Sequence, residues 1–548
     1  MKDLALLALD TAKSKGASYA DVHVCRYRNQ YIVGRDDRIE AVADTEDLGF
    51  GVRAVADGAW GFASSYRVEK DEIQRIASLA VDVAKASARI LKNRVELAAE
   101  PAHRDHWQSP IQKNPFKIPT DRTIDLILAI NKEMLKVEGI KVATCFFNFN
   151  GVWKLFASTD GSMIEQDFIY VYPNATAVAV GAGDSQTRSI QIPPEQKGYE
   201  LIDSVNWIER ARQAAEEAVR KLKAKEGVTG TKDLILMPSH LCLTIHESIG
   251  HATELDRALG WEAGYAGTTF VTRDKLGTLK YGSPLMNIVG DKLLPNALGT
   301  AGYDDDGVKA RSFPIIKDGL FVGYQTTREL ARFVGEKESK GCAYADSWSS
   351  FPIQRMPNIW LQPGEKPLSV DELVADTKDG LLFDGTGSFS IDHQRYNFQF
   401  GGDAIWEVKN GKLGDMVKNV AYQSKTTDFW GSLDAVCSKD HAGKDHLREP
   451  GKIPVAGDLL LGDGLDPLRR QRHIDQRCLQ PPQPERGGPQ GQEKGHRRPQ
   501  RAEPGEDPGR RGAGGCDRRR RPRKHRDHAH ARAAGLSPDP APVLPADS

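Results

Sequence analysis

Several familiar patterns are missing from this 548-residue sequence. Its seven cysteines are scattered and include no C-x-x-C pair, which argues against a disulfide framework or a zinc ribbon and favours a reducing compartment. No segment approaches the roughly 18 apolar residues that a membrane-spanning helix needs. Residues 1–16 show no convincing cleavage site and predict an amphipathic helix, not a signal peptide. We therefore expect a soluble, cytoplasmic protein with no membrane contact.

A phosphate-binding loop is also missing. Residues 48–55 and 59–63 have the composition of two strands, and Asp57-Gly58 between them favours a tight hairpin. No G-x-G-x-x-G pattern opens a helix at this point, so the glycines here do not predict nucleotide binding.

The end of the chain contains no aromatic residue. From Leu465 onward, 19 basic residues, 17 of them arginine, face 11 acidic ones. Such a segment buries too little apolar surface to offset its ordering entropy, so residues 446–548 are predicted to be a poorly structured Arg/Pro/Gly-rich tail. A nucleic-acid arm or a genuine solvated tail would suit this composition. We favour a third interpretation, a coding sequence translated in the wrong frame, and expect no nucleic-acid partner.

The remaining sequence predicts an α+β protein with two domains. Helical and strand patterns alternate over residues 1–225, which indicates an N-terminal α/β domain. Helices are expected at residues 69–91 and 204–225, and a strand at residues 19–25 with His23 facing solvent. Residues 226–445 predict a β-rich domain.

Two hairpins are expected in this second domain, at Lys317-Asp318-Gly319 and at Lys409-Asn410-Gly411-Lys412. Near its start, residues 233–237 form an apolar strand pattern. Pro238-Ser239 then ends the strand and offers a serine cap for a helix over residues 240–259.

This helix contains His246, Glu247 and His251. Histidines four apart share one helix face, but a spacing of five leaves the two rings about 140° out of line on a regular helix. A one-residue widening of π type would bring them together, and Gly250 would ease it. Two imidazoles could then hold zinc, with Glu247 as general base for a zinc-bound water. On spacing alone, an ordinary surface helix is the favoured interpretation.

The surrounding residues change that balance. The segment His246-Glu247-Ser248-Ile249-Gly250-His251-Ala252-Thr253-Glu254-Leu255-Asp256-Arg257 resembles the signature helix of the TldD/PmbA peptidase family. Residues 19–22 and 49–53 resemble the family's early strand and Gly-rich hairpin, and residues 303–307, 354–358 and 429–432 resemble later motifs. The match covers roughly residues 1–441. Because the partner branch of the family lacks His-Glu-x-x-x-His, the chain resembles the catalytic, TldD-like branch.

The resemblance implies a metallopeptidase with zinc held by His246 and His251 and with Glu247 as catalytic base. It also implies a homodimer, or a heterodimer with a PmbA-like subunit, around a cavity that admits unfolded or small peptides. The family's third zinc ligand is a cysteine in a Cys-Gly-Lys context, which this sequence does not contain. The nearest candidate is Cys437, for which a buried apolar position is the favoured interpretation.

Two hypotheses follow. The chain is an active zinc peptidase, or it is a catalytically silent assembly or binding subunit of a TldD/PmbA-type complex, because two histidines alone form an incomplete site. A reading-frame slip between His441 and Leu465 would explain both the lost resemblance and the missing cysteine context.

The tail hypothesis predicts that removing residues 465–548 leaves the free energy of unfolding of the body unchanged within about 1 kcal/mol. Denaturant unfolding of both chains measures this, and a markedly less stable body would contradict it. Resequencing of the gene tests the frame directly, since a corrected frame should restore Cys-Gly-Lys.

Overall fold

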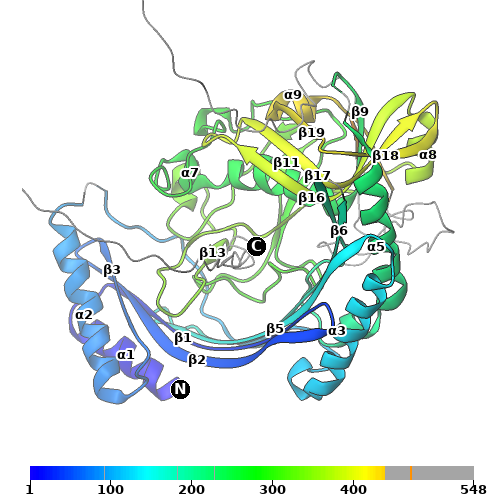
Figure 1. The fold of residues 1–548 in the computed structure, drawn as a ribbon. Helices are drawn as coiled ribbons and strands as arrows, with labels where there is room; N and C mark the ends of the chain where they lie inside the picture. Colours follow the sequence, from blue (N-terminus) through cyan, green and yellow to red (C-terminus); the bar gives the residue numbers. More distant parts are fainter. Residues whose placement is uncertain (92, 182, 228, 439–468, 472–548) are drawn as a thin grey trace, which may run out of the picture. The chain divides into compact units, whose positions relative to one another are not determined.

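The computed structural model describes residues 1–91, 93–181, 183–227, 229–438 and 469–471, all within one compact unit (Figure 1). Its helices and strands form several sheets with helices packed on them, which confirms the predicted α+β class. Among these residues, every helix is too short or too polar to cross a membrane. The predicted domain limits at residues 225 and 445 stay predictions.

The first part of the chain forms a seven-stranded sheet in the order β3-β2-β1-β5-β6-β4, with β7 paired to β6. Its strands are β1 (Tyr19–Arg35), β2 (Arg38–Ala56), β3 (Ala59–Ser65), β4 (Arg104–Gln108), β5 (Ile140–Ser158), β6 (Met163–Gly181) and β7 (Asp184–Ser189). Two pairs of helices cover one face (Figure 1): α1 (Lys2–Ser14) with α2 (Lys70–Ala88), and α3 (Thr120–Leu135) with α5 (Trp207–Lys223). A one-turn helix, α4 (Glu200–Asp203), precedes α5.

The later part of the chain forms three further sheets. The largest has the order β20-β21-β9-β16-β17-β18-β8, with β19 paired to β17. Its strands are β8 (Lys225–Glu226), β9 (Asp233–Leu236), β16 (Asp379–Ile391), β17 (Asn397–Lys409), β18 (Lys412–Lys418), β19 (Ala421–Lys425), β20 (Leu433–Val436) and β21 (Arg469–Gln471). The two smaller sheets contain β10 (Ile288–Asp291), β11 (Ser312–Lys317), β12 (Leu320–Phe321) and β15 (Asn358–Leu361), and β13 (Ala343–Tyr344) with β14 (Ile353–Gln354). The helices α8 (Val370–Asp376) and α9 (Thr426–Gly431) lie between these strands in sequence.

The three predicted hairpins are present because their turn residues tolerate a left-handed backbone. Asp57 and Gly58, with φ of 52° and 82°, join β2 to β3. Asp318-Gly319 joins β11 to β12, and Asn410-Gly411 joins β17 to β18, again with both residues at positive φ. Two-residue turns of this type match the twist of the strands that they connect.

The uncovered face of the first sheet contacts the later part of the chain through buried charges. The Arg53 guanidinium binds Asp21 on β1 and reaches Asp306 at 2.7 Å, and Lys154 on β5 binds Asp305 at 2.9 Å. Because an unpaired charge is costly to bury, removing either partner of such a pair is strongly destabilising. These pairs define where the two parts of the chain meet.

The prediction that His23 faces solvent is wrong. The side chain lies on the face of β1 that the later part of the chain covers, and the residue is only 7% exposed. Its ring packs edge-on against Phe156, and burial lowers the pKa of the imidazole. Alternation in sequence marks the two faces of a strand, but not which of them another domain covers.

A second correction concerns the predicted tail. Residues 469–471 form β21, which pairs with β9 and β20, so the prediction of a poorly structured segment is wrong for these three residues. Backbone pairing needs no apolar side chain, which explains why composition did not reveal this strand. The rest of the predicted tail, residues 446–468 and 472–548, lies outside the described residues.

The pairing of β21 changes the result expected from removing residues 465–548, because this truncation also removes the strand. A chain that ends at Gly464 should be less stable than one that ends at Gln471 by roughly 1–3 kcal/mol, because several backbone hydrogen bonds to β9 and β20 are lost. Urea denaturation of both truncated chains measures the difference. Equal midpoints and slopes would show that β21 contributes nothing to stability.

Candidate metal centre

The segment that carries the two histidines begins directly after β9. Pro238 occupies the first turn of α6 (Pro238–Ile245), where its missing N–H costs no hydrogen bond. The predicted serine cap is wrong, because the residue at the cap is Met237 and has no side-chain hydrogen bond. Ser239 lies inside the helix; its hydroxyl donates to Asp384 and accepts from the Gly385 N–H at 2.8 Å. It therefore ties α6 to β16.

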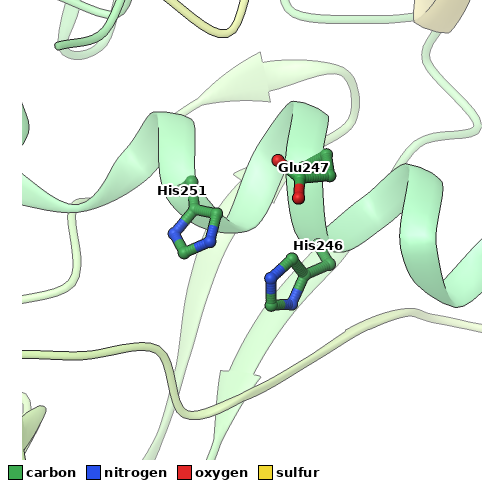
Figure 2. A group of neighbouring side chains, drawn as sticks. All are labelled: His246, Glu247 and His251. Atoms are coloured by element: carbon green, nitrogen blue, oxygen red, sulfur yellow. The ribbon is translucent and has the colours of Figure 1, made fainter. Parts of the chain in front are cut away.

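The helix widens at the two histidines. Residues His246–Gly250 form a π turn, in which the N–H of His251 donates to the carbonyl of His246, five residues earlier. The widening that a shared metal site would require is therefore present. The additional residue in the turn brings His246 and His251 to the same side of the chain (Figure 2), with ring centroids 4.6 Å apart.

Side chains bind the backbone carbonyls of this irregular segment. The Tyr281 hydroxyl donates to the carbonyl of Ser248, and the Gln325 amide donates to that of Gly250 at 2.6 Å. Within the segment, the hydroxyls of Ser248 and Thr253 donate to carbonyls four residues earlier. Buried carbonyls need such partners, so these contacts stabilise the widened turn against a regular helix.

Gly250 was expected to ease the widening of the turn through its backbone freedom, but the structure gives it a different role. Its φ of −52° is ordinary for a helix, so the site does not use the backbone freedom of glycine. A Cβ atom at this position would lie 2.4 Å from the sulfur of Met356 and would collide with it. The glycine therefore allows a close contact between the turn and a neighbouring side chain.

The predicted continuous helix over residues 240–259 is also wrong. After a short 3₁₀ turn at His251–Thr253, Glu254 is extended, with ψ of 125°, and forms a bridge to Gln325. The chain becomes helical again only in α7 (Leu255–Ala258). The hydrophobic period continues across this break, and periodicity alone did not reveal it.

Three possible metal ligands meet on the widened turn. One ligand atom each from His246, Glu247 and His251 lies within 4.8 Å of the other two (Figure 2). His251 and Glu247 are buried, whereas His246 is partly exposed. Two imidazoles and a carboxylate are donors that zinc and similar divalent ions accept. The described residues here can therefore hold a metal ion.

A carboxylate and a guanidinium orient His251. Its Nδ1 lies 2.8 Å from Oε2 of Glu254, and that carboxylate also accepts from Nε of Arg257 at 2.5 Å. Arg257 Nη2 is 2.8 Å from the same Nδ1 and, as a donor, can bond it only in the tautomer in which Nδ1 carries no proton; all three residues are buried. When Nδ1 donates to Glu254, the lone pair of Nε2 is available to a metal, which is the usual arrangement behind a metal-binding histidine.

A second arginine holds Glu247. Arg395, in the turn between β16 and β17, forms an ion pair with Oε2 of the carboxylate. It also donates to the carbonyl of Ala266 at 3.1 Å, and Arg257 donates to the same carbonyl. Arg395 has a φ of 62°, which is uncommon outside glycine and asparagine and tends to occur at functional sites. The two arginines are thus fixed against each other through one backbone oxygen.

Cys437 lies elsewhere. Its side chain is fully buried in an apolar cluster with Ile235, Met237 and Leu382, and it does not belong to the group of donors around His246. This position fits the interpretation of Cys437 as a small apolar residue.

Sequence reasoning identified the three donors but not the residues that orient them. Glu254 and Arg257 follow His251 at spacings of three and six, so their position on the same segment was a usable signal. Arg395 is 148 residues from Glu247, and no local pattern connects them.

Three family models match the chain along most of its length. Models of the PmbA/TldA metallopeptidase domain 1, central domain and C-terminal domain match residues 20–84, 113–224 and 229–454. The chain belongs to the PmbA/TldD metallopeptidase family.

Relatives in this PmbA/TldD family are named metalloproteases. One from Methanocaldococcus jannaschii is 28% identical, with 80% of this chain and 94% of the relative covered. A zinc metalloprotease TldD homolog from Saccharolobus solfataricus is 24% identical, with 78% and 90% covered. The solved structure of TldE from Thermococcus kodakarensis has the same fold, with a TM-score of 0.67 at 14% identity over 87% of this chain and 99% of that one.

His240, at the start of the PmbA/TldD metal-site segment, makes the fold sensitive to acid. Its Nδ1 lies 3.0 Å from the carbonyl of Gly385, and its Nε2 lies 3.0 Å from the hydroxyl of Tyr422. This arrangement suits a neutral ring, which donates once and accepts once. Burial lowers the pKa of His240 from 6.5 to about 4.

Because the unfolded chain binds this proton at higher pH, the neutral ring contributes stability above pH 6.5, and that contribution is lost as pH falls towards 4. The loss should be at most about 3 kcal/mol. Urea unfolding of the protein and of His240→Gln between pH 7 and 4.5 measures it. The substitution should flatten the pH dependence; parallel curves would contradict the assignment.

Proposed function

We propose that this chain is a zinc-dependent peptidase that cleaves unfolded or small peptides. His246 and His251 hold the metal, and Glu247 is the general base. The observation that carries the proposal is the meeting of two imidazoles and a carboxylate within 4.8 Å on a turn whose neighbours fix their orientation. Family membership and the zinc metalloprotease among the relatives support the choice of metal and reaction class.

The donor set fits zinc, since two neutral imidazoles with an acidic residue beside them are typical of catalytic zinc sites. Bound zinc supplies a water of pKa about 7 and a positive charge that polarises a peptide carbonyl. The family's third ligand is a cysteine in a Cys-Gly-Lys context, and the described residues place only His246, Glu247 and His251 together.

The protein's own groups divide the remaining tasks. Arg395 binds Oε2 of Glu247, so Oε1 is the oxygen positioned to accept a proton and later to return it to the leaving amine. Glu254 fixes the ring of His251, and Arg257 balances the charge of Glu254. These contacts hold the site in one geometry before substrate binds.

The second hypothesis, a catalytically silent assembly or binding subunit, is favoured by the missing Cys-Gly-Lys context. In either case we propose a homodimer or a heterodimer with a PmbA-like subunit, in the cytoplasm.

Metal analysis separates the two hypotheses. An active peptidase prepared without chelators should retain close to one zinc per chain, because activity would require a third protein ligand besides His246 and His251, and a site with three protein ligands binds zinc tightly. Less than about 0.1 zinc per chain would favour the silent subunit. Peptide cleavage by the isolated chain would exclude the silent subunit.

Glu247→Gln should abolish peptide cleavage and leave the zinc content unchanged, because it removes the base and not a histidine ligand. Cleavage of an unstructured peptide and metal content are measured on the same preparation. Glu365→Gln, the same change at an exposed residue, is the control. Retained activity in Glu247→Gln would rule out the role of base.

Glu254→Gln should weaken zinc binding by about ten- to a hundredfold, because the amide holds the His251 ring less firmly than the carboxylate does. Competition with a chelating dye measures the affinity. Unchanged affinity, in a variant that unfolds at the same temperature as the parent, would show that Glu254 does not orient the ligand.

A further inference from the structure

A cavity of about 470 Å³ lies beside the metal-site segment and is bounded by both parts of the chain. One side consists of Trp60 on β3 and the segment that follows α2, and the other includes Asp256 on α7. Asp256 lies two residues after Glu254, the carboxylate that binds His251. A cavity of this size accommodates a small organic ligand or a long side chain.

Three carboxylates line the cavity and have no cationic partner among their hydrogen bonds. Asp256 accepts from the backbone N–H of Arg257 at 2.7 Å, and Glu329 accepts from the indole of Trp60 at 2.8 Å. Oε2 of Glu262 is buried and has no hydrogen-bond partner among the described residues. Desolvation by burial raises the pKa of both Asp256 and Glu329, although Arg257 lies near the first and Arg332 and Arg53 lie near the second.

The two arginines in the wall already have acidic partners, one of which, Asp306, also lines the cavity. Arg53 binds Asp21 and Asp306, and Arg332 binds Glu96 and donates to the carbonyl of Arg94. The cavity therefore contains three carboxyl groups without a hydrogen-bonded cation among the described residues, and a bound cation would favour their ionised forms.

Two further residues that line the cavity each have one buried polar atom without a hydrogen-bond partner among the described residues. Gln354 is 2% exposed, and its Oε1 has no hydrogen-bond partner among the described residues. Nε of Arg332 is likewise buried and unpaired within that part of the chain. Buried polar atoms are rarely left unsatisfied, so a ligand that donates near Gln354 and accepts near Arg332 would complete both.

Four aromatic rings also line the wall. Trp60 and Phe351 meet edge to face at 5.5 Å, and Trp261 and Phe333 do so at 5.7 Å. Aromatic rings bind apolar stems and attract cations over their faces. A ligand with an apolar stem and a positive end suits both features of the wall.

We propose that this cavity binds an organic cation, an ammonium or guanidinium group on an apolar stem. The cation lies against Glu262, Glu329 and Asp256, and the stem lies between the aromatic rings. An adjoining carbonyl accepts from Nε of Arg332, as the amide of a peptide would. The basic side chain of a peptide substrate meets all three requirements; that last step rests on the proposed peptidase function, whereas cation binding does not.

Calorimetric titration of the full-length protein, after chelator treatment to remove metal, tests the proposal. Nα-acetyl-lysine amide should bind at least about ten times more tightly than Nα-acetyl-norleucine amide, which has the stem and the carbonyls but no charge. The preference should disappear in Glu262→Gln and persist in the exposed control Glu365→Gln. Equal binding of the two amides, or a preference that survives Glu262→Gln, would overturn the proposal.

Trp261→Leu provides a second variant, since Trp261 is 51% exposed and its loss should not unfold the chain. It should weaken binding of both amides by a similar factor, because it removes a ring from the site of the stem. Unchanged binding would place the ligand outside the cavity.

A third probe, n-butylamine, distinguishes the two sources of the cation. Tighter binding of the lysine amide than of butylamine would assign the cavity to a peptide, and equal binding would assign it to a free alkylamine. Because all titrations use metal-free protein, they are independent of peptide cleavage. An inactive chain that binds the lysine amide would refute the peptidase and keep the cation site.

Discussion

The metal centre depends on one backbone hydrogen bond, from the N–H of His251 to the carbonyl of His246. A regular helix would connect residues four apart and point the two imidazoles in different directions. The five-residue turn loses the regular hydrogen bonds of an α-helix, and surrounding side chains bind the backbone carbonyls instead. Tyr281, Gln325 and the segment's own hydroxyls bind its carbonyls, so the wide turn is a satisfied structure.

The buried acids that contact the candidate metal site are each paired with an arginine. Arg257 binds Glu254 and Arg395 binds Glu247, and both guanidinium groups donate to the carbonyl of Ala266. Pairing of this kind lets carboxylates stay ionised where water is scarce. The acids of the neighbouring cavity differ in this respect. Asp256, Glu262 and Glu329 have no arginine side chain among their hydrogen-bond partners in the described part of the chain.

Local chemistry in the sequence predicted a good part of this structure. Turn dipeptides located three hairpins, and the five-residue spacing of His246 and His251 indicated that a shared metal site would need a widened turn. The errors have a common cause, since each depended on residues distant in the chain. The burial of His23, the contact of Gly250 with Met356 and the pairing of β21 with β9 are all set by tertiary contacts. A pattern within ten or twenty residues carries no information about them.

The β16–β17 hairpin is held at two places. Near the middle, Arg188 of the first sheet binds Asp384 on β16 and Asp403 on β17. At the tip, Arg395 binds Glu247. The hairpin is therefore fixed to the first sheet near its middle and to the carboxylate of Glu247 at its tip. The position of the Glu247 carboxylate therefore depends on contacts with the first sheet, although that sheet supplies none of the three possible metal ligands.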